Sequence, residues 1–130
     1  MKRRSIAFSA IAVGFFTVTG AQAAPVSQED FQLATTANLV SLCSATSTDP
    51  LYTAAQNFCH GFTVGTYRAL ATEQAASSAR NKLFCPAPNT PTRDQAISAF
   101  VQWASSRPKT LGSSPTDGIA EYLAAQFPCK

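Results

Sequence analysis

The stretch that decides the fold spans residues 49–72 and reads DPLYTAAQNFCHGFTVGTYRALAT. Asp49 and Pro50 are typical of a helix start, because aspartate accepts hydrogen bonds from free amides and proline at the first position loses no bond. We therefore expect a helix from residue 50 to about residue 72. Its apolar and small residues recur every three or four positions, which is the spacing of one buried helix face. They are Leu51, Ala54, Ala55, Phe58, Phe62, Gly65 and Ala69.

Two shorter segments precede this helix. Residues 36–43 are predicted to form a helix that begins at Thr36 as N-cap and buries Leu39 and Leu42. Residues 24–35 are a lead-in with two readings. Phe31 and Leu33 alternate with polar neighbours, as in an extended segment, whereas Ser27 followed three residues later by an acid is typical of a helix start.

Two helices are predicted after a proline-containing connection over residues 73–91. Thr92 and Gln95 form a capping box at the start of the first, and Pro108 stops it. Its buried stripe is Ala96, Ile97, Phe100, Val101 and Ala104. The second opens at Ser114 and Pro115 and ends before Pro128, with Ile119, Leu123 and Phe127 on its inner face. The sequence therefore predicts an all-α fold, a small disulfide-linked bundle of about four helices.

The first 23 residues are typical of a secretory signal peptide. Lys2, Arg3 and Arg4 form a positive n-region, an apolar segment follows, and residues 21–23 (Ala-Gln-Ala) provide the cleavage site. We expect cleavage before Ala24 and a single mature domain over residues 24–130, located in the periplasm. The apolar segment is short for a membrane span, which needs roughly 20 apolar residues, so we expect no membrane association after cleavage.

The charge balance argues against a nucleic-acid partner. The chain has ten Lys and Arg against seven Asp and Glu, but three of the ten lie in the signal peptide. The predicted mature domain is therefore formally neutral and has no basic run to follow a phosphate backbone.

Four cysteines lie in the mature part, and an even number in a small exported chain indicates disulfides. No pair has the C-x-x-C spacing of a zinc site, so we predict no metal. Three connectivities are open. If successive helices are antiparallel, Cys85 and Cys129 meet at one end of the bundle and Cys43 pairs with Cys59, which favours that connectivity.

No catalytic site is predicted. His60 is the only histidine, its neighbouring cysteine is expected to be oxidised, and Asp49 lies about three helical turns away. We therefore expect a surface or half-buried His60, no catalytic residue and no cofactor. Gly61 and Gly65 lie four residues apart on one helix face. They indicate either close packing against another helix, which we favour, or a ligand groove.

These features together resemble the Rap/Tai family of type VI secretion immunity proteins. The resemblance runs from Thr35 to Cys129, and its most specific element is the motif Phe58, Cys59, Gly61, Phe62 and Gly65. It implies an exported, non-enzymatic, all-helical protein of a kind that is often a homodimer. It also implies that the protein binds a protein toxin, a peptidoglycan amidase, and covers its active-site cleft, often with a loop.

The resemblance does not transfer a toxin-binding site residue by residue. We expect contacts in two exposed segments, residues 80–89 and 107–114, and at one tryptophan whose position is equally compatible with the core. The candidate residues are Arg80, Lys82, Asn89, Trp103, Arg107 and Lys109. Two alternatives stay open: a periplasmic acid-stress chaperone of the HdeA type and a subunit of an envelope complex.

Overall fold

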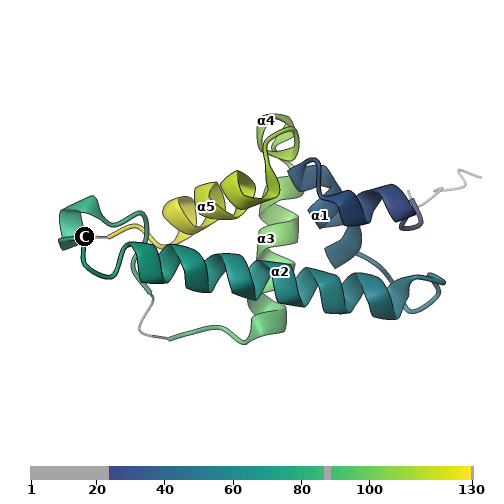
Figure 1. Cartoon of the computed structure of the whole chain (residues 1–130), viewed down its shortest axis with the longest axis horizontal. Helices are drawn as coiled ribbons and strands as arrows, with labels where there is room; N and C mark the ends of the chain where they lie inside the picture. The colour runs from purple at the N-terminus through teal and green to yellow at the C-terminus, as the bar shows by residue number, and fades with distance from the viewer. Residues whose placement is uncertain (1–23, 87–88, 130) are drawn as a thin grey trace, which may run out of the picture.

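A computed structural model describes residues 24–86 and 89–129. These residues form five α-helices and two 3-10 turns (Figure 1). The predicted signal peptide lies outside the described residues. In chain order the elements are η1 (Gln28–Gln32), α1 (Thr36–Cys43), α2 (Tyr52–Glu73), η2 (Ala79–Asn81), α3 (Arg93–Ser105), α4 (Pro108–Leu111) and α5 (Pro115–Gln126). The all-α prediction is confirmed.

Helix α2 runs along the length of the molecule (Figure 1). Helix α3 crosses it, α5 lies along its C-terminal half, and α1 lies near its N-terminal half. The described part of the chain is thus an irregular assembly around one long helix, and α2 and α3 are not an antiparallel pair.

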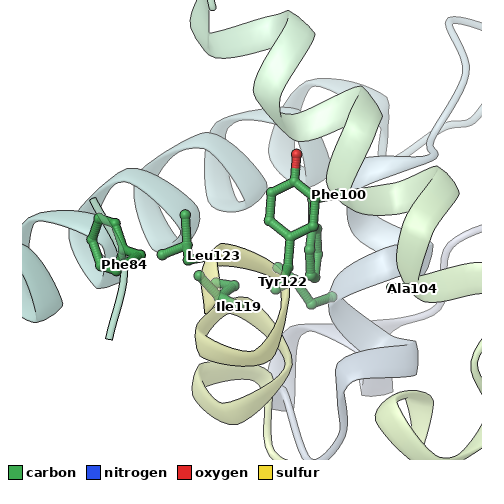
Figure 2. Close-up of a cluster of buried hydrophobic side chains, with 7 residues drawn as sticks. Phe84, Phe100, Ala104, Ile119, Tyr122 and Leu123 are labelled. Atoms are coloured by element: carbon green, nitrogen blue, oxygen red, sulfur yellow. The ribbon is translucent and has the colours of Figure 1, made fainter. Parts of the chain in front are cut away.

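Two clusters of buried side chains hold these helices together. The larger lies between α1, α3, α5 and the segment after η2, and most of its members are drawn in Figure 2. It comprises Leu39, Phe84, Phe100, Ala104, Ile119, Tyr122 and Leu123. The smaller lies where α1 meets α2 and α3 and comprises Val26, Leu42, Ala55, Cys59 and Ile97. The predicted inner faces of α3 and α5 are therefore confirmed.

The predicted buried face of α2 is partly right, since Ala55 is buried and Leu51 and Phe62 pack against the two clusters, but the rest of that face is wrong. Only Ala55 and Cys59 are buried on this helix, whereas Phe58 is 39 % exposed and Ala54, Gly65 and Ala69 are exposed. The helix is turned so that Cys59 faces inward, because its disulfide to Cys43 fixes the rotation of α2 against α1. The apolar residues of α2 do recur at helical spacing, but the Cys43–Cys59 disulfide determines which side of the helix faces the core.

The prediction that Gly61 and Gly65 allow close packing against another helix is also wrong. A Cβ atom at Gly61 or Gly65 would meet nothing within 4 Å. The close helix approach occurs instead at Gly118 on α5, where a Cβ atom would lie 2.7 Å from Thr36 Cγ2. The Thr36 hydroxyl is buried there and donates to the Ser114 carbonyl at 2.9 Å. Gly118 therefore lets α5 pack against the first turn of α1.

Most of the predicted helix starts are confirmed. Thr92 and Gln95 form the expected capping box on α3, and the Ser114 side chain accepts from Asp117 N. The N-cap of α1 is Thr35 and not Thr36, since the Thr36 hydroxyl is used against the turn before α5.

Residues 24–35 and 107–114 each contain a short helical element. Ser27 and Asp30 form a capping box on η1, so the extended reading of the lead-in is wrong. The exposed segment 107–114, for which no helix was predicted, contains α4, because Pro108 stands at the first helical position, where its missing N–H costs nothing.

The structure joins Cys43 to Cys59 and Cys85 to Cys129, which agrees with the favoured connectivity. No described cysteine is free. Disulfides persist in oxidising compartments, so the two bridges indicate a protein that works outside the cytoplasm. None of the described helices is long and apolar enough to cross a membrane.

Candidate partner-binding surface

A largely exposed irregular segment joins α2 to the second disulfide. We call residues 75–83 the Gln74 loop, because the side chain of Gln74 closes it. Gln74 Nε2 donates to the Phe84 carbonyl at 2.8 Å, and Gln74 Oε1 accepts from Leu83 N at 2.8 Å and from Phe84 N at 3.3 Å. One amide side chain therefore satisfies three backbone groups at the base of the loop.

The residues that follow the loop anchor it to the core. Phe84 is 1 % exposed and packs on Tyr67 with ring centroids 5.5 Å apart. Cys85 N donates to the Phe127 carbonyl at 2.7 Å, and the disulfide joins Cys85 to Cys129. The C-terminal side of the loop is thus tied down by burial, a hydrogen bond and a covalent bond.

The tip of the Gln74 loop presents basic and apolar groups. Arg80 lies in η2 and is exposed, Lys82 is half-buried, and Leu83 is 42 % exposed. No Asp or Glu occurs between residues 74 and 92. A partner that receives this loop should therefore offer an acidic surface with an apolar contact.

The other predicted contact segment is a compact corner made by the end of α3 and by α4. The Arg107 guanidinium lies 4.2 Å from the centre of the Trp103 ring, and its Nη1 donates to the Trp103 carbonyl at 2.6 Å. Trp103 is half-buried and packs edge-to-face on Tyr122 at 5.6 Å. Lys109 is exposed on α4.

The structure divides the six candidate residues into two groups. The Gln74 loop carries Arg80 and Lys82, with the exposed Asn89 further along the same connection, while Trp103, Arg107 and Lys109 belong to the corner around α4. The two segments lie at different edges of the molecule in Figure 1. The six residues therefore do not form one continuous surface patch.

The motif that carries the family resemblance lies mostly on the outer side of α2. The exceptions are Cys59, which is buried in its disulfide, and Phe62, which packs against the larger buried cluster. Phe58 packs edge-to-face on Phe31 at 5.6 Å, which ties η1 to α2. The cysteine and the aromatic residues of the motif thus serve the scaffold in this chain, and the two glycines leave the helix surface bare.

His60 is half-buried, as predicted, with 32 % of its side chain exposed. Its Nε2 lies 3.6 Å from Asp94 Oδ1 on α3, so the neighbouring acid comes from another helix and not from Asp49. Every described cysteine is in a disulfide, and His60 therefore has no thiol to activate. The described residues also hold no group of three or more side chains suited to a metal ion.

Two other acids serve the fold. The Asp49 carboxylate accepts from Val26 N at 2.7 Å and from Leu51 N at 2.8 Å, so it joins the N-terminal segment to the start of α2. Partial burial would raise the pKa of Asp30, but hydrogen bonds from Ser27, Asn38 and Ser41 outweigh burial and lower the pKa of this carboxyl.

Sequence reasoning missed Gln74, Leu83 and Gly118. Nothing in the sequence marked Gln74 as important, because a glutamine at a helix end is common and its hydrogen-bond partners lie nine and ten residues away. Leu83 was passed over as one apolar residue in a polar segment. Gly118 lies in the first turn of a helix, where a glycine attracts attention only if the neighbouring helix is known.

The geometry defines a small, doubly cross-linked helical binding module with a closed, outward-facing loop. The model of the family described as Rap1a immunity proteins matches residues 35–129, and the chain belongs to this family. The protein is therefore an immunity protein, which acts by binding a cognate toxin and not as an enzyme. Searches of curated proteins and of solved structures find no match.

Proposed function

We propose that this protein is exported through the signal peptide in residues 1–23 and protects the periplasm against a type VI secretion effector. The effector is a peptidoglycan amidase, and inhibition consists of covering its active-site cleft. The support for this proposal is the family membership together with the family resemblance of the motif around Cys59. The family membership also favours an immunity protein over an acid-stress chaperone or an envelope-complex subunit.

The Gln74 loop is our candidate for the segment that enters the cleft. The single observation that carries this assignment is the closure of the loop by three hydrogen bonds to one side chain. A loop that is already ordered before binding loses less conformational entropy when it binds. Leu83 would fill an apolar position of the cleft, and Arg80 and Lys82 would face acidic groups beside it.

The corner around α4 is the weaker candidate. Arg107 is already engaged by the ring and carbonyl of Trp103, and half of Trp103 is occupied by core contacts. We assign Trp103, Arg107 and Lys109 to the rim of the complex, where removal of a charge changes affinity by less than about 1 kcal/mol.

The experiment uses the oxidised protein, recovered from the periplasm of the expressing cell, as bait for envelope and secreted proteins of its host. We expect one partner in equal stoichiometry that cleaves peptidoglycan amide bonds and stops doing so when bound. Arg80→Glu should weaken capture, and Lys109→Glu is the matched charge reversal at the other corner. Capture that is unaffected by Arg80→Glu but lost with Lys109→Glu would transfer the contact to α4.

The homodimer implied by the resemblance is a separate proposal. The outer face of α2 would form its interface, because Phe58 there is exposed and Gly61 and Gly65 would let a second helix approach closely. Sedimentation at increasing concentration should show a dimer that Gly61→Glu dissociates. A monomer over the whole range would remove this proposal and leave the toxin contact untouched.

A further inference from the structure

An apolar cavity of about 220 Å³ lies between α2, α3, α5 and the segment after the Gln74 loop. Its walls include Val64 on α2, Ala96 and Ile97 on α3, and Leu123 on α5. An engineered cavity of about 150 Å³ takes benzene, whereas sites for drug-sized ligands begin at about 300 Å³. The cavity therefore suits one aromatic ring or one short alkyl chain.

The walls of this cavity also carry a few polar side chains, among them that of Tyr122. Tyr122 is 6 % exposed. Figure 2 shows its hydroxyl at the end of the ring that points away from α5. Desolvation alone raises the pKa of this hydroxyl, with no hydrogen bond contributing. A ligand that reaches this hydroxyl could accept a hydrogen bond from it.

The rim of the cavity is basic on the side of α2 and α3. Arg93 and Val64 line both the cavity and a shallow depression beside it, which also includes His60 and Arg68. Asp94 is the acid nearby, and its carboxylate lies 3.6 Å from His60 Nε2. Arg93 thus lines both the cavity and the depression, and Arg68 lines the depression, where one carboxylate is already next to the histidine.

We propose that this cavity binds a small amphipathic anion, with its single alkyl chain or aromatic ring among the apolar walls and its anionic group beside Arg93 and Arg68. The bare surface at Gly61 and Gly65 keeps the approach to these guanidinium groups open, since no side chain of α2 covers them there. This site is separate from the Gln74 loop, and the proposal does not depend on the identity of the toxin. It shares Gly61 and Gly65 with the proposed dimer interface, so a dimer through that face and the ligand would exclude one another.

The test is a titration of the full oxidised protein with octanoate, octan-1-ol and octyltrimethylammonium, followed by NMR of backbone amides. Octanoate should saturate with a Kd of about 1 mM or tighter and shift Val64, Ile97 and Leu123. Because exposed ion pairs contribute little, it should bind about twofold to fivefold more tightly than octanol. The ammonium compound should bind most weakly.

Two variants separate the parts of the site. Arg93→Gln should reduce octanoate affinity about twofold to fivefold and leave octanol unchanged, while Arg107→Gln, an equal charge loss elsewhere, should change neither. Ala96→Leu should fill the cavity and abolish binding of both compounds, while Ala99→Leu, on the exposed side of the same helix, should not. If Ala96→Leu fails to fold, Val64→Phe takes its place.

Several results would overturn the proposal. One is octanoate that does not saturate by about 10 mM. Another is equal affinity for all three compounds together with no effect of Arg93→Gln. Undiminished binding to the filled variant would place the ligand outside the cavity and would equally contradict it.

Discussion

Replacement of Gln74 by alanine should release the Gln74 loop without unfolding the protein. The change removes three hydrogen bonds, two of them at 2.8 Å, and leaves the amide and carbonyl of the buried Phe84 without their partners. A typical protein hydrogen bond contributes about 0.5–1.5 kcal/mol net, and an unpaired buried group costs about 1–3 kcal/mol. Because Leu83 is exposed and water can replace its bond, we expect a total loss of about 2–3 kcal/mol.

The assay is amide hydrogen exchange, read at Leu83 and Phe84. A loss of about 2–3 kcal/mol corresponds to roughly 30- to 150-fold faster exchange at these two amides, if they exchange by local opening of the loop. Amides in the middle of α3 should change less, since the core contacts of Phe84 and the second disulfide remain. Toxin affinity should fall together with protection, because the loop must then be ordered on binding.

The matched control is Gln102→Ala on the exposed side of α3, which should change stability by less than about 0.5 kcal/mol. Unchanged exchange at Phe84 in Gln74→Ala would refute the reasoning, because the loop would then be ordered by something other than this side chain. Faster exchange with unchanged toxin affinity would keep the structural account and reject the role of the loop in binding.

Three further predictions concern the scaffold. Gly118→Ala should lower the free energy of unfolding by about 1–3 kcal/mol in chemical denaturation, since the added methyl overlaps α1, whereas Gly61→Ala should raise it by up to about 1 kcal/mol; equal effects would contradict the packing assigned to α5. Replacing Cys85 and Cys129 by serine should lower the free energy of unfolding by about 4 kcal/mol in the chain-entropy model. A decrease in the thermal unfolding temperature that is too small for this value would contradict the prediction. Because hydrogen bonds lower the pKa of Asp30 in the folded state, its stabilisation is present above the unfolded pKa of about 3.9 and lost as pH falls through the folded value; denaturation at pH 7 and pH 2 should therefore differ less in Asp30→Asn than in the wild type.

The parts of the fold that local chemistry decides could be predicted from the sequence. Thr92 with Gln95, and Ser114 with Pro115, marked helix starts because caps and prolines act within one turn. The faces of α3 and α5 were also found, since their apolar residues are large and regularly spaced. The disulfide pairing was anticipated, although α2 and α3 are not antiparallel as assumed.

What could not be predicted depends on partners far away in the chain. The rotation of α2 follows from Cys59 bonding to Cys43, and small residues such as Ala54 and Gly65 gave no counter-evidence to the wrong face. Thr36 and Gly118 have their roles only because α1 packs against α5. These two residues are 82 positions apart in the sequence. Closure of the Gln74 loop likewise needs the backbone of Phe84 to return to the end of α2.

We propose that this immunity protein silences a cell-wall amidase by placing the Gln74 loop in its cleft. The most direct measurement is the rate of peptidoglycan amide cleavage by the captured toxin as wild-type protein or Leu83→Asp is added. We predict that the wild type abolishes cleavage at one equivalent, whereas Leu83→Asp requires a large excess. Full inhibition by both proteins at one equivalent, or cleavage that continues when the wild type is bound, would contradict the account.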